Sequence, residues 1–285
     1  MKIAITGATG HLGNTVIQEL LDKKGNDTII AVVRNKEKAD KQFPAAINIR
    51  YGNYNDYASL LKAFSEVDKL LFISSPSNDD MERVVQHATV IKAARDASVG
   101  QIYYTSFSHA DHSTISLAKL HLATEAAIKV SNLDYTFIRN PLYSEVFINA
   151  SLKESVASGE LVTNTGKGTL NTASRDDLAK AAATLLCTDG YRNEIVDLAS
   201  SHLWSFDDLA ETLTEASGKK VIHRAVSQPE AIQHFVASGM PEPAAEFTAE
   251  MYQAISDGDI SQTEPHLTKL IGQETTLKEM VFRSI

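Results

Sequence analysis

Three evenly spaced glycines follow the first apolar run of the chain. Residues 3–13 read IAITGATGHLG, which places Gly7, Gly10 and Gly13 between a predicted strand and a predicted helix. One glycine turns the chain sharply, one lets a ligand approach the backbone, and one lets the helix pack close to the sheet. The free N–H groups at the start of the helix attract phosphate. The pattern therefore predicts a pyrophosphate-binding turn, and the alternative is a tight turn without a ligand.

The alternation of strands and helices in the first half of the chain determines the fold class. Apolar runs without strict alternation are typical of strands buried on both faces of a sheet. The pattern predicts an α/β fold with a Rossmann-type, doubly wound parallel sheet and right-handed crossovers. The charged segment 35–46 is too short to predict as a helix. Strands are predicted at 2–6, 28–33, 47–51, 69–75, 101–106 and 134–139, and helices at 11–24, 56–66, 80–97 and 114–131.

The second half is less regular and is predicted to form a smaller, mostly helical lobe. Ser174, Ser205 and Ser227 are predicted N-caps, because acidic residues follow each of them within three positions. Short strands are predicted near 160–163, 194–199 and 220–225. We expect an NAD(P)-binding domain at residues 1–140 and a substrate-binding lobe at 141–285 that packs on it, with the ligand cleft between the two.

The charge of the chain disfavours several kinds of partner. Its 285 residues carry a net charge of −9, which argues against nucleic acid and against an anionic membrane surface. No apolar run approaches the roughly 18 residues of a membrane span, and the N-terminus lacks the apolar core of a signal peptide. The single cysteine, Cys187, lies in the apolar run AAATLLC and is predicted to be buried. We expect a soluble, cytoplasmic monomer or homodimer.

Three motifs resemble one family, and the resemblance covers nearly the whole chain. TGATGHLG (6–13), HLATE (121–125) and RNPLYSE (139–145) are similar to the NmrA-like group of atypical short-chain dehydrogenases/reductases. Within it, the bacterial NADPH:quinone oxidoreductases of the second type and the triphenylmethane reductases are the most similar. For Ser74 and Ser75, the alternative to binding the cofactor is that they only begin a turn. The cofactor-binding residues that the resemblance implies are Thr6, Gly7, Ala8, Thr9, Gly10, His11, Leu12, Gly13, Arg34, Ser74, Ser75, Pro76, Thr105, Ser106, His121, Asn140, Pro141, Leu142 and Tyr143.

The residues after the second strand select between the two nicotinamide cofactors. NAD-specific sites carry an acid there, which binds the ribose 2′-hydroxyl. Here the strand ends AVVRN, so that Arg34 occupies this place, with Lys36 and Lys38 close behind. A guanidinium pairs with the 2′-phosphate, whereas an acid would repel it. The sequence therefore predicts NADP(H), and the alternative reading of Arg34 is a solvated surface charge.

The helix after the fifth strand departs from the main branch of the superfamily. The resemblance aligns the usual catalytic tyrosine with Leu117 and the usual lysine with His121, while Glu125 is expected to make a helix-surface or supporting contact. Leu117 cannot donate a proton, but an imidazole with the ordinary pKa near 6.5 could. We predict His121 as a catalytic residue. The alternatives are a structural histidine, a ribose contact, or a metal ligand near the SHADHS segment (108–113), but no clean motif supports a metal.

The RNPLYSE segment is expected to lie against the nicotinamide. Pro141 cannot continue a strand interior, so it forces a turn beside the matching residue Asn140. Tyr143 is a second catalytic candidate, because it can stack on a flat acceptor or donate a hydrogen bond. The alternative is that Tyr143 packs the interface between the lobes. Phe107 and Phe147 are further candidates to line an apolar acceptor pocket.

The missing Tyr–Lys pair favours an acceptor that needs little help with a proton. Hydride addition to a quinone gives a delocalised hydroquinone anion, and a triphenylmethane cation needs no proton. The sequence predicts an NADPH-dependent oxidoreductase that transfers a hydride to a quinone-like or other conjugated acceptor. The alternative is a non-catalytic NmrA-like sensor of NADP(H) that binds another protein. A sugar-nucleotide epimerase or dehydratase is disfavoured, because those enzymes need the missing pair.

Overall fold

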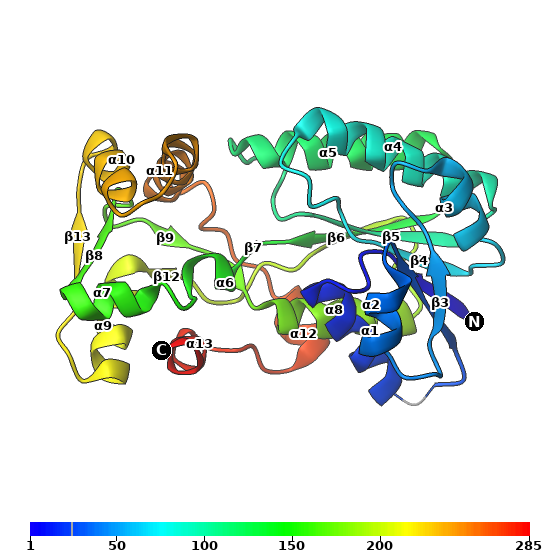
Figure 1. Cartoon of the computed structure of the whole chain (residues 1–285), viewed down its shortest axis with the longest axis horizontal. Coiled ribbons are helices and arrows are strands. Elements are labelled where there is room, and N and C mark those ends of the chain that lie inside the picture. Colours follow the sequence, from blue (N-terminus) through cyan, green and yellow to red (C-terminus); the bar gives the residue numbers. More distant parts are fainter. Residues whose placement is uncertain (24) are drawn as a thin grey trace.

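The computed structural model describes residues 1–23 and 25–285 and has two lobes side by side (Figure 1). The strands of the larger lobe are β1 (Lys2–Ile5), β2 (Thr28–Val33), β3 (Asn48–Tyr51), β4 (Lys69–Phe72), β5 (Gln101–Phe107), β6 (Tyr135–Asn140) and β11 (Glu194–Asp197). They form a seven-stranded sheet in the order β11-β6-β5-β4-β1-β2-β3, with every neighbouring pair parallel. This confirms the predicted Rossmann-type α/β fold.

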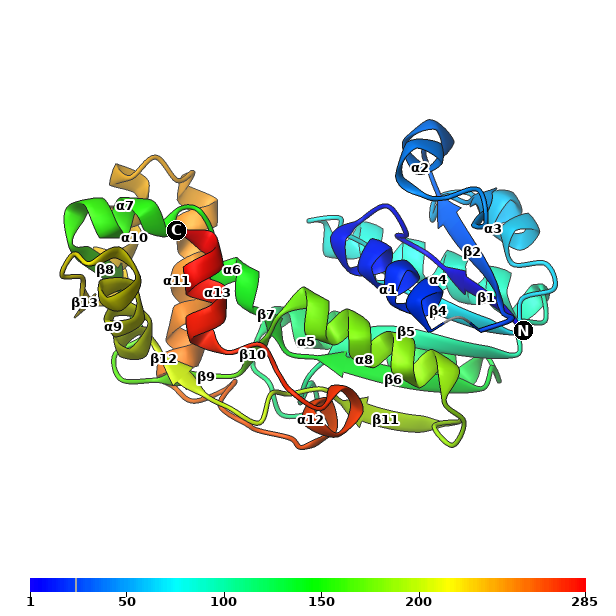
Figure 2. The same cartoon turned by 90° about the horizontal axis from the view of Figure 1, so that it is seen from below.

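Helices cover both faces of the sheet (Figures 1 and 2). Successive residues of a strand point to opposite faces. In β1, Ile3 and Ile5 pack with the helices of one face, whereas Ala4 packs with those of the other. The first face carries α1 (His11–Asp22), α2 (Lys36–Gln42), α8 (Arg175–Cys187) and α12 (His266–Ile271), and the second carries α3 (Tyr57–Ala63), α4 (Asp80–Asp96) and α5 (Ser116–Val130).

Helix α2 forms in the charged segment that was not predicted to be helical. Its N-cap is Asn35, whose side-chain oxygen accepts a hydrogen bond from the N–H of Lys38 at 2.9 Å. Ala39 is its buried residue and packs into the core under the sheet. One cap and one buried contact are therefore sufficient for a two-turn helix here, and neither stands out against the surrounding charges in the sequence.

Three elements from the second half of the chain belong to the larger lobe. Strand β11 pairs with β6 along Glu194–Asp197, and α8 packs against α1 with Leu178 and Leu185 in the same core. Leu267 of α12 joins that core. The division of the chain at residue 140 stays a prediction. In the structure the chain leaves the larger lobe at residue 140, returns to it with α8 and β11, and returns again with α12.

The smaller lobe has its own core of aromatic side chains. Phe147, Trp204, Phe206 and Tyr252 pack edge to face and stacked, with ring centroids 5.1 to 6.3 Å apart. The elements of this lobe are β7 (Leu142–Tyr143), α6 (Ser144–Phe147), α7 (Leu152–Ser158), β8 (Glu160–Thr163), β9 (Thr169–Leu170), β10 (Thr172–Ala173), β12 (Trp204–Ser205), α9 (Phe206–Ser217), β13 (Ile222–Ala225), α10 (Gln228–Ala237), α11 (Glu242–Ser256) and α13 (Leu277–Ser284).

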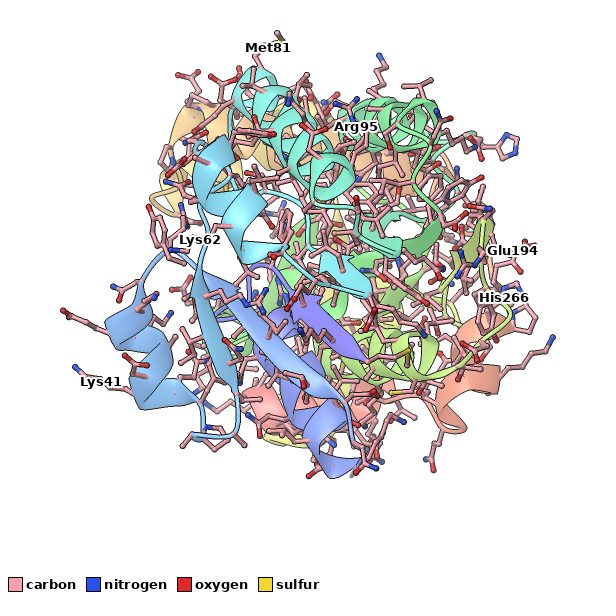
Figure 3. All side chains as sticks on the ribbon, turned by 90° about the vertical axis from the view of Figure 1, so that its right-hand side faces the viewer. Lys41, Lys62, Met81, Arg95, Glu194 and His266 are labelled. Atoms are coloured by element: carbon pink, nitrogen blue, oxygen red, sulfur yellow. The ribbon has the colours of Figure 1, made fainter. Side chains whose placement is uncertain are left out.

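The predicted helix starts are confirmed, and the prediction for the cysteine is wrong. Ser174, Ser205 and Ser227 are the N-caps of α8, α9 and α10. Cys187 is exposed, because α8 ends at this residue and the chain then turns into an exposed loop. Among the described residues, no helix is long and apolar enough to cross a membrane. Side chains that extend into solvent on the face shown in Figure 3 include Lys41, Lys62, Met81, Arg95, Glu194 and His266.

Candidate active site

The glycine turn lies where the strand order of the sheet reverses, between β1 and β4. Ligands of doubly wound sheets bind outside the carboxyl ends of the strands at such a point. Gly7 has a φ of 59°, which is a left-handed conformation that favours glycine. A Cβ at Gly13 would lie 2.5 Å from the carbonyl oxygen of Gly7, so α1 can approach the turn this closely only with glycine there. Within the described chain no side chain caps α1 after Gly10, which leaves its first N–H groups available.

The side chains of the other turn residues lie in different surroundings, some in the core and some in solvent. The side chains of Ala8 and Leu12 pack in the core, so only their backbone atoms are available to a ligand. His11 is exposed, and its Nε2 lies 3.0 Å from Asp176 at the start of α8. The Nζ of Lys38 donates to the carbonyl oxygen of Thr9 at 3.3 Å. The N-termini of α1 and α8 therefore meet at one edge of the sheet.

Tyr54, which follows β3, holds the ends of β1 and β4 together. Its hydroxyl lies 2.6 Å from both the Thr6 hydroxyl and the carbonyl oxygen of Ile73. The Thr6 oxygen accepts the N–H of Ile73 at 3.0 Å. Burial raises the pKa of Tyr54, while the nearby positive charge of Arg34 lowers it. Tyr54 therefore keeps its proton and holds the ends of β1 and β4 in place next to the glycine turn. The sequence analysis did not assign this role to Tyr54.

Arg34 is exposed directly after β2. No described residue forms an ion pair or a side-chain hydrogen bond with its guanidinium, which leaves all its donors available. Because β2 pairs with β1 in parallel, the end of β2 puts this charge at the same edge of the sheet as the glycine turn. With Lys38 at Thr9, this edge of the site carries two cations.

A buried histidine holds the loop that follows β4. The backbone N–H of Ser75 donates to Nε2 of His87 at 2.9 Å, and Nδ1 of the same ring lies 2.9 Å from the hydroxyl of Thr124 on α5. Burial lowers the pKa of His87 to about 4, so the ring is neutral at physiological pH. This pairing requires the hydrogen on Nδ1 and the lone pair on Nε2. The N–H of Ser74 donates to the hydroxyl of Thr105 at 3.0 Å.

The imidazole of His121 is buried and carries no charge at neutral pH. Its Nδ1 lies 2.8 Å from the Tyr104 hydroxyl, and its ring stacks on Phe107 at 6.3 Å. Burial is the main cause that lowers its pKa to about 3, and electrostatic interactions with Arg83 and His87 add to it. The pKa of His121 therefore lies well below the ordinary histidine value, because the ring is enclosed in the core. Its catalytic role stays a prediction.

Glu125 is buried rather than placed on the helix surface. Its carboxylate accepts from Nε and the second terminal nitrogen of Arg139 at 2.9 and 2.8 Å, and from the hydroxyl of Ser106 at 2.6 Å. Arg139 also donates to Asp111 at 2.5 Å. Burial by itself would lower the pKa of Arg139, but these contacts outweigh it and raise the pKa. The pair joins α5 to the end of β6 and so positions the segment that begins at Asn140.

Asn140 and Tyr143 lie at the junction of the two lobes. The side-chain oxygen of Asn140 is buried and has no hydrogen-bond partner among the described residues. The guanidinium of Arg175, at the start of α8, lies 4.4 Å above the ring of Tyr143. Burial raises the pKa of Tyr143, while Arg175 and the side chain of Asn140 lower it. Tyr143 therefore keeps its proton at neutral pH, whereas Phe147 lies in the core of the smaller lobe.

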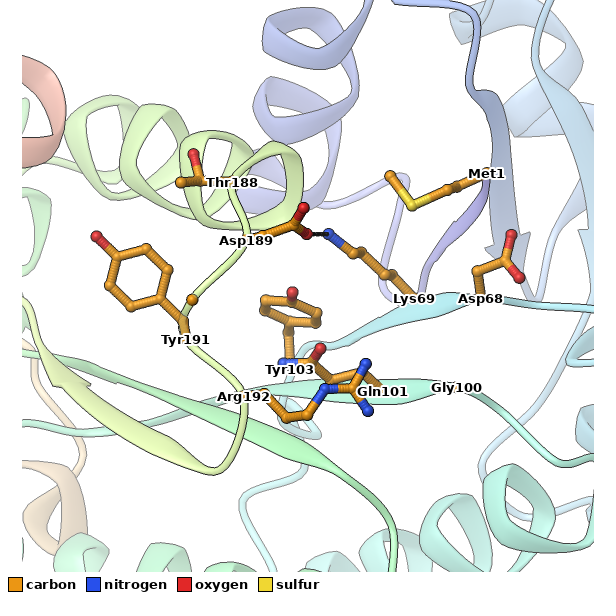
Figure 4. Close-up of a pocket in the computed structure, with 11 residues that line it drawn as sticks. Met1, Asp68, Lys69, Gly100, Gln101, Tyr103, Thr188, Asp189, Tyr191 and Arg192 are labelled. Atoms are coloured by element: carbon orange, nitrogen blue, oxygen red, sulfur yellow. Dashed lines mark ion pairs between the residues drawn. The ribbon is translucent and has the colours of Figure 1, made fainter.

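The hollow in Figure 4 lies at the opposite edge of the sheet. It is lined by the amino ends of β4 and β5 and by the loop after α8. Its buried cation, Lys69, donates to the carbonyl oxygen of Leu186 at 2.8 Å and lies 3.7 Å from Asp189. Because ligands of this fold bind at the carboxyl edge, we place the site at the glycine turn. In the part of the chain that is described, no group of three or more His, Cys, Asp or Glu side chains is arranged to hold a metal ion.

Comparisons with known proteins identify the family of this chain. Residues 7–189 match the NAD(P)H-binding family model. Quinone oxidoreductase 2 of Escherichia coli (strain K12) is 37% identical over 274 residues, which are 96% of this chain and 95% of the relative. An NmrA-like family domain-containing oxidoreductase of Aspergillus flavus is 28% identical and covers 96% of this chain and 91% of its own.

Two solved structures are similar over the whole length. The triphenylmethane reductase of Citrobacter sp., complexed with NADP(H), is 50% identical with a TM-score of 0.96 and covers 99% of this chain and 100% of its own. The NADPH-dependent quinone oxidoreductase of E. coli, complexed with NADPH, is 37% identical with a TM-score of 0.93 and covers 99% of both chains. The chain therefore belongs to the NAD(P)H-binding family, among the NmrA-like oxidoreductases that its motifs predicted.

Proposed function

We propose that this protein is an NADPH-dependent oxidoreductase that transfers a hydride to a quinone-like or other conjugated acceptor. The observation that carries the proposal is the neutral, buried His121 at the position that the main branch gives to a lysine. Because this position carries no charged proton donor, the site suits an acceptor whose reduced form spreads its negative charge and needs little help with protonation. The similarity to the E. coli quinone oxidoreductase and to the Citrobacter triphenylmethane reductase supports this class of acceptor.

Three features of the carboxyl edge fit NADPH. The glycine turn and the uncapped first turn of α1 suit the pyrophosphate. The guanidinium of Arg34, with Lys38 close by, suits the 2′-phosphate. The buried, unpaired oxygen of Asn140 suits an amide donor such as the carboxamide of nicotinamide.

We infer that all the residues predicted from the sequence contact the cofactor, Ala8 and Leu12 through their backbone atoms alone. When bound, the reduced nicotinamide supplies the hydride. The chain binds and orients it: His87 fixes the backbone of Ser75, and the ion pair of Glu125 with Arg139 fixes the strand that ends at Asn140. His121 and Tyr143 stay the proposed catalytic pair, acting as neutral groups toward the nicotinamide and the acceptor.

Mixing the purified protein and NADPH with a panel of small quinones and a cationic triphenylmethane dye tests this proposal. Absorbance of the reduced nicotinamide reports oxidation, and NADH serves as the comparison cofactor. Turnover with NADPH supports the enzyme. Tight NADPH binding without oxidation across the panel would favour the alternative, a non-catalytic sensor of NADP(H). A cytoplasmic location and a monomeric or homodimeric state stay predictions from the sequence.

A further inference from the structure

We propose that the hollow shown in Figure 4 is a second ligand site, which binds a small carboxylate at the ammonium group of Lys69. This hollow lies at the amino edge of the sheet, where β4 and β5 begin. The glycine turn follows the end of β1 and lies at the opposite, carboxyl edge. Binding in the hollow is therefore independent of the proposed oxidoreductase activity.

Lys69 places a positive charge inside the protein that its neighbours compensate only in part. Its side chain is 8% exposed, although lysine is almost never buried without a partner. Its Nζ donates to the carbonyl oxygen of Leu186 at 2.8 Å, in the last turn of α8. This contact is typical of a lysine near the C-terminus of a helix and uses one of its three N–H donors. The other two have no hydrogen-bond partner among the described residues.

Asp189 is the ion-pair partner of Lys69 among the described residues, and it is a weak one. Its Oδ1 lies 3.7 Å from Nζ, which is longer than a hydrogen bond. Its side chain is fully exposed, so water solvates its charge, and an ion pair with so exposed a carboxylate contributes little. The ammonium group therefore lacks what a buried cation needs, which is an enclosed anion that accepts its hydrogen bonds.

The hollow beside Lys69 has room for a small molecule. Its volume of about 380 Å³ lies within the range of about 300–1,000 Å³ that is usual for ligand pockets. Tyr103, Tyr191 and Met1 contribute apolar surface to its walls (Figure 4). Burial raises the pKa of Tyr103 to about 12, so its phenol is uncharged at neutral pH and does not repel an anion. A carboxylate attached to a flat, apolar body fits such walls.

The charges around the hollow favour a ligand with a single negative charge. Asp68 and Asp189 both line it and would repel a doubly charged phosphate. The two other cations of the lining, on Arg192 and at the N-terminus of Met1, each pair with an acid elsewhere. Lys69 is therefore the cation that remains for a ligand. The two oxygens of a carboxylate can accept from both of its remaining N–H groups.

Isothermal titration calorimetry with benzoate tests this site. Benzamide is the matched probe, because it has the same shape and no charge. Benzoate should bind at least about 10-fold more tightly than benzamide, the effect of a hydrogen bond to a charged group. Each titration is repeated on protein saturated with NADPH, which occupies the carboxyl edge. The Kd of benzoate should be the same with and without NADPH.

Two substitutions should change the Kd of benzoate in opposite directions. Lys69→Met keeps the aliphatic bulk, removes the charge and should weaken binding at least about 10-fold. Asp189→Asn removes the competing carboxylate and should strengthen binding about threefold, as for one exposed ion pair. Lys62→Met, at an exposed lysine of α3, is the matched control and should leave the Kd unchanged (Figure 3). Thermal unfolding and NADPH affinity check that each variant folds.

Equal affinities for benzoate and benzamide, or a wild-type Kd in Lys69→Met, would overturn the site. Displacement of benzoate by NADPH would move the binding to the carboxyl edge and would overturn it as well, as would the absence of binding at millimolar benzoate. If Lys69→Met does not fold, Asp189→Asn decides. Tighter binding in that variant supports the site, and an unchanged Kd overturns it.

Discussion

Replacing Glu125 by glutamine tests how the site is held together. Glu125 and Arg139 are 3% and 5% exposed and share two hydrogen bonds of 2.9 and 2.8 Å. The substitution keeps the shape of the side chain and removes its charge. Arg139 would then retain Asp111, whose side chain is 54% exposed, as its charged partner.

The expected loss follows from the burial of the pair. Removing one partner of a buried ion pair costs about 3–5 kcal/mol. Because Asp111 still contacts the guanidinium, we expect about 3 kcal/mol, the lower end of that range. An unfolding entropy of about 2.1 cal/mol/K per residue gives a chain of this length about 0.6 kcal/mol/K. The melting temperature should therefore fall by about 5 °C if the chain unfolds as one unit.

Thermal unfolding followed by circular dichroism measures this change. Glu160→Gln is the matched control, because the ion pair of Glu160 with Arg224 is about half exposed and should contribute little. The double variant Glu125→Leu/Arg139→Met should recover part of the loss, since it leaves no unpaired buried charge. A decrease below about 1 °C for Glu125→Gln, or a double variant less stable than the single one, would refute the reasoning.

Three further predictions concern the cofactor and acid stability. Arg34→Ala should weaken NADPH binding about 10- to 100-fold in a fluorescence titration, the effect of one charged hydrogen-bonding group, and leave NADH within twofold; equal losses would contradict the 2′-phosphate assignment. Gly13→Ala should abolish NADPH binding in the same titration, because its Cβ would lie 2.5 Å from the Gly7 carbonyl oxygen; unchanged binding would contradict it. His87 and His121 have pKa values lowered to about 4 and about 3, so the unfolded chain binds their protons first. The free energy of unfolding, measured with urea, should therefore fall as pH decreases from about 6.5 toward 4, and less steeply in His87→Gln; equal slopes would contradict this.

The turn and the sheet could be predicted because their causes are local. The glycine spacing sets the turn, and β-branched runs mark strands wherever they lie. The partner of a strand is not local. Strand β11 was predicted as a short strand at 194–199, but nothing in that segment shows that it pairs with β6 in the main sheet. The same holds for α8, whose apolar face packs on α1.

Supporting residues of the site could not be predicted, since tertiary contacts define them. Tyr54 and His87 reach the turn and the Ser75 loop from other elements, and no neighbour in sequence marks them for that role. The burial of His121 and Glu125 could have been found. Both lie on the stripe of α5 that carries Ala118 and other buried residues at helical spacing, and a polar group on such a stripe is paired in the core.

In the proposed site, the lack of charge on His121 of α5 suits both an uncharged quinone and a cationic dye. If His121 faces the nicotinamide as proposed, a lysine at this position would repel a cationic dye. The imidazole of His121 carries no charge at neutral pH, and Tyr143 keeps its proton. Under the proposed function, neither side chain would therefore repel a cationic dye, and neither requires the acceptor to carry a charge.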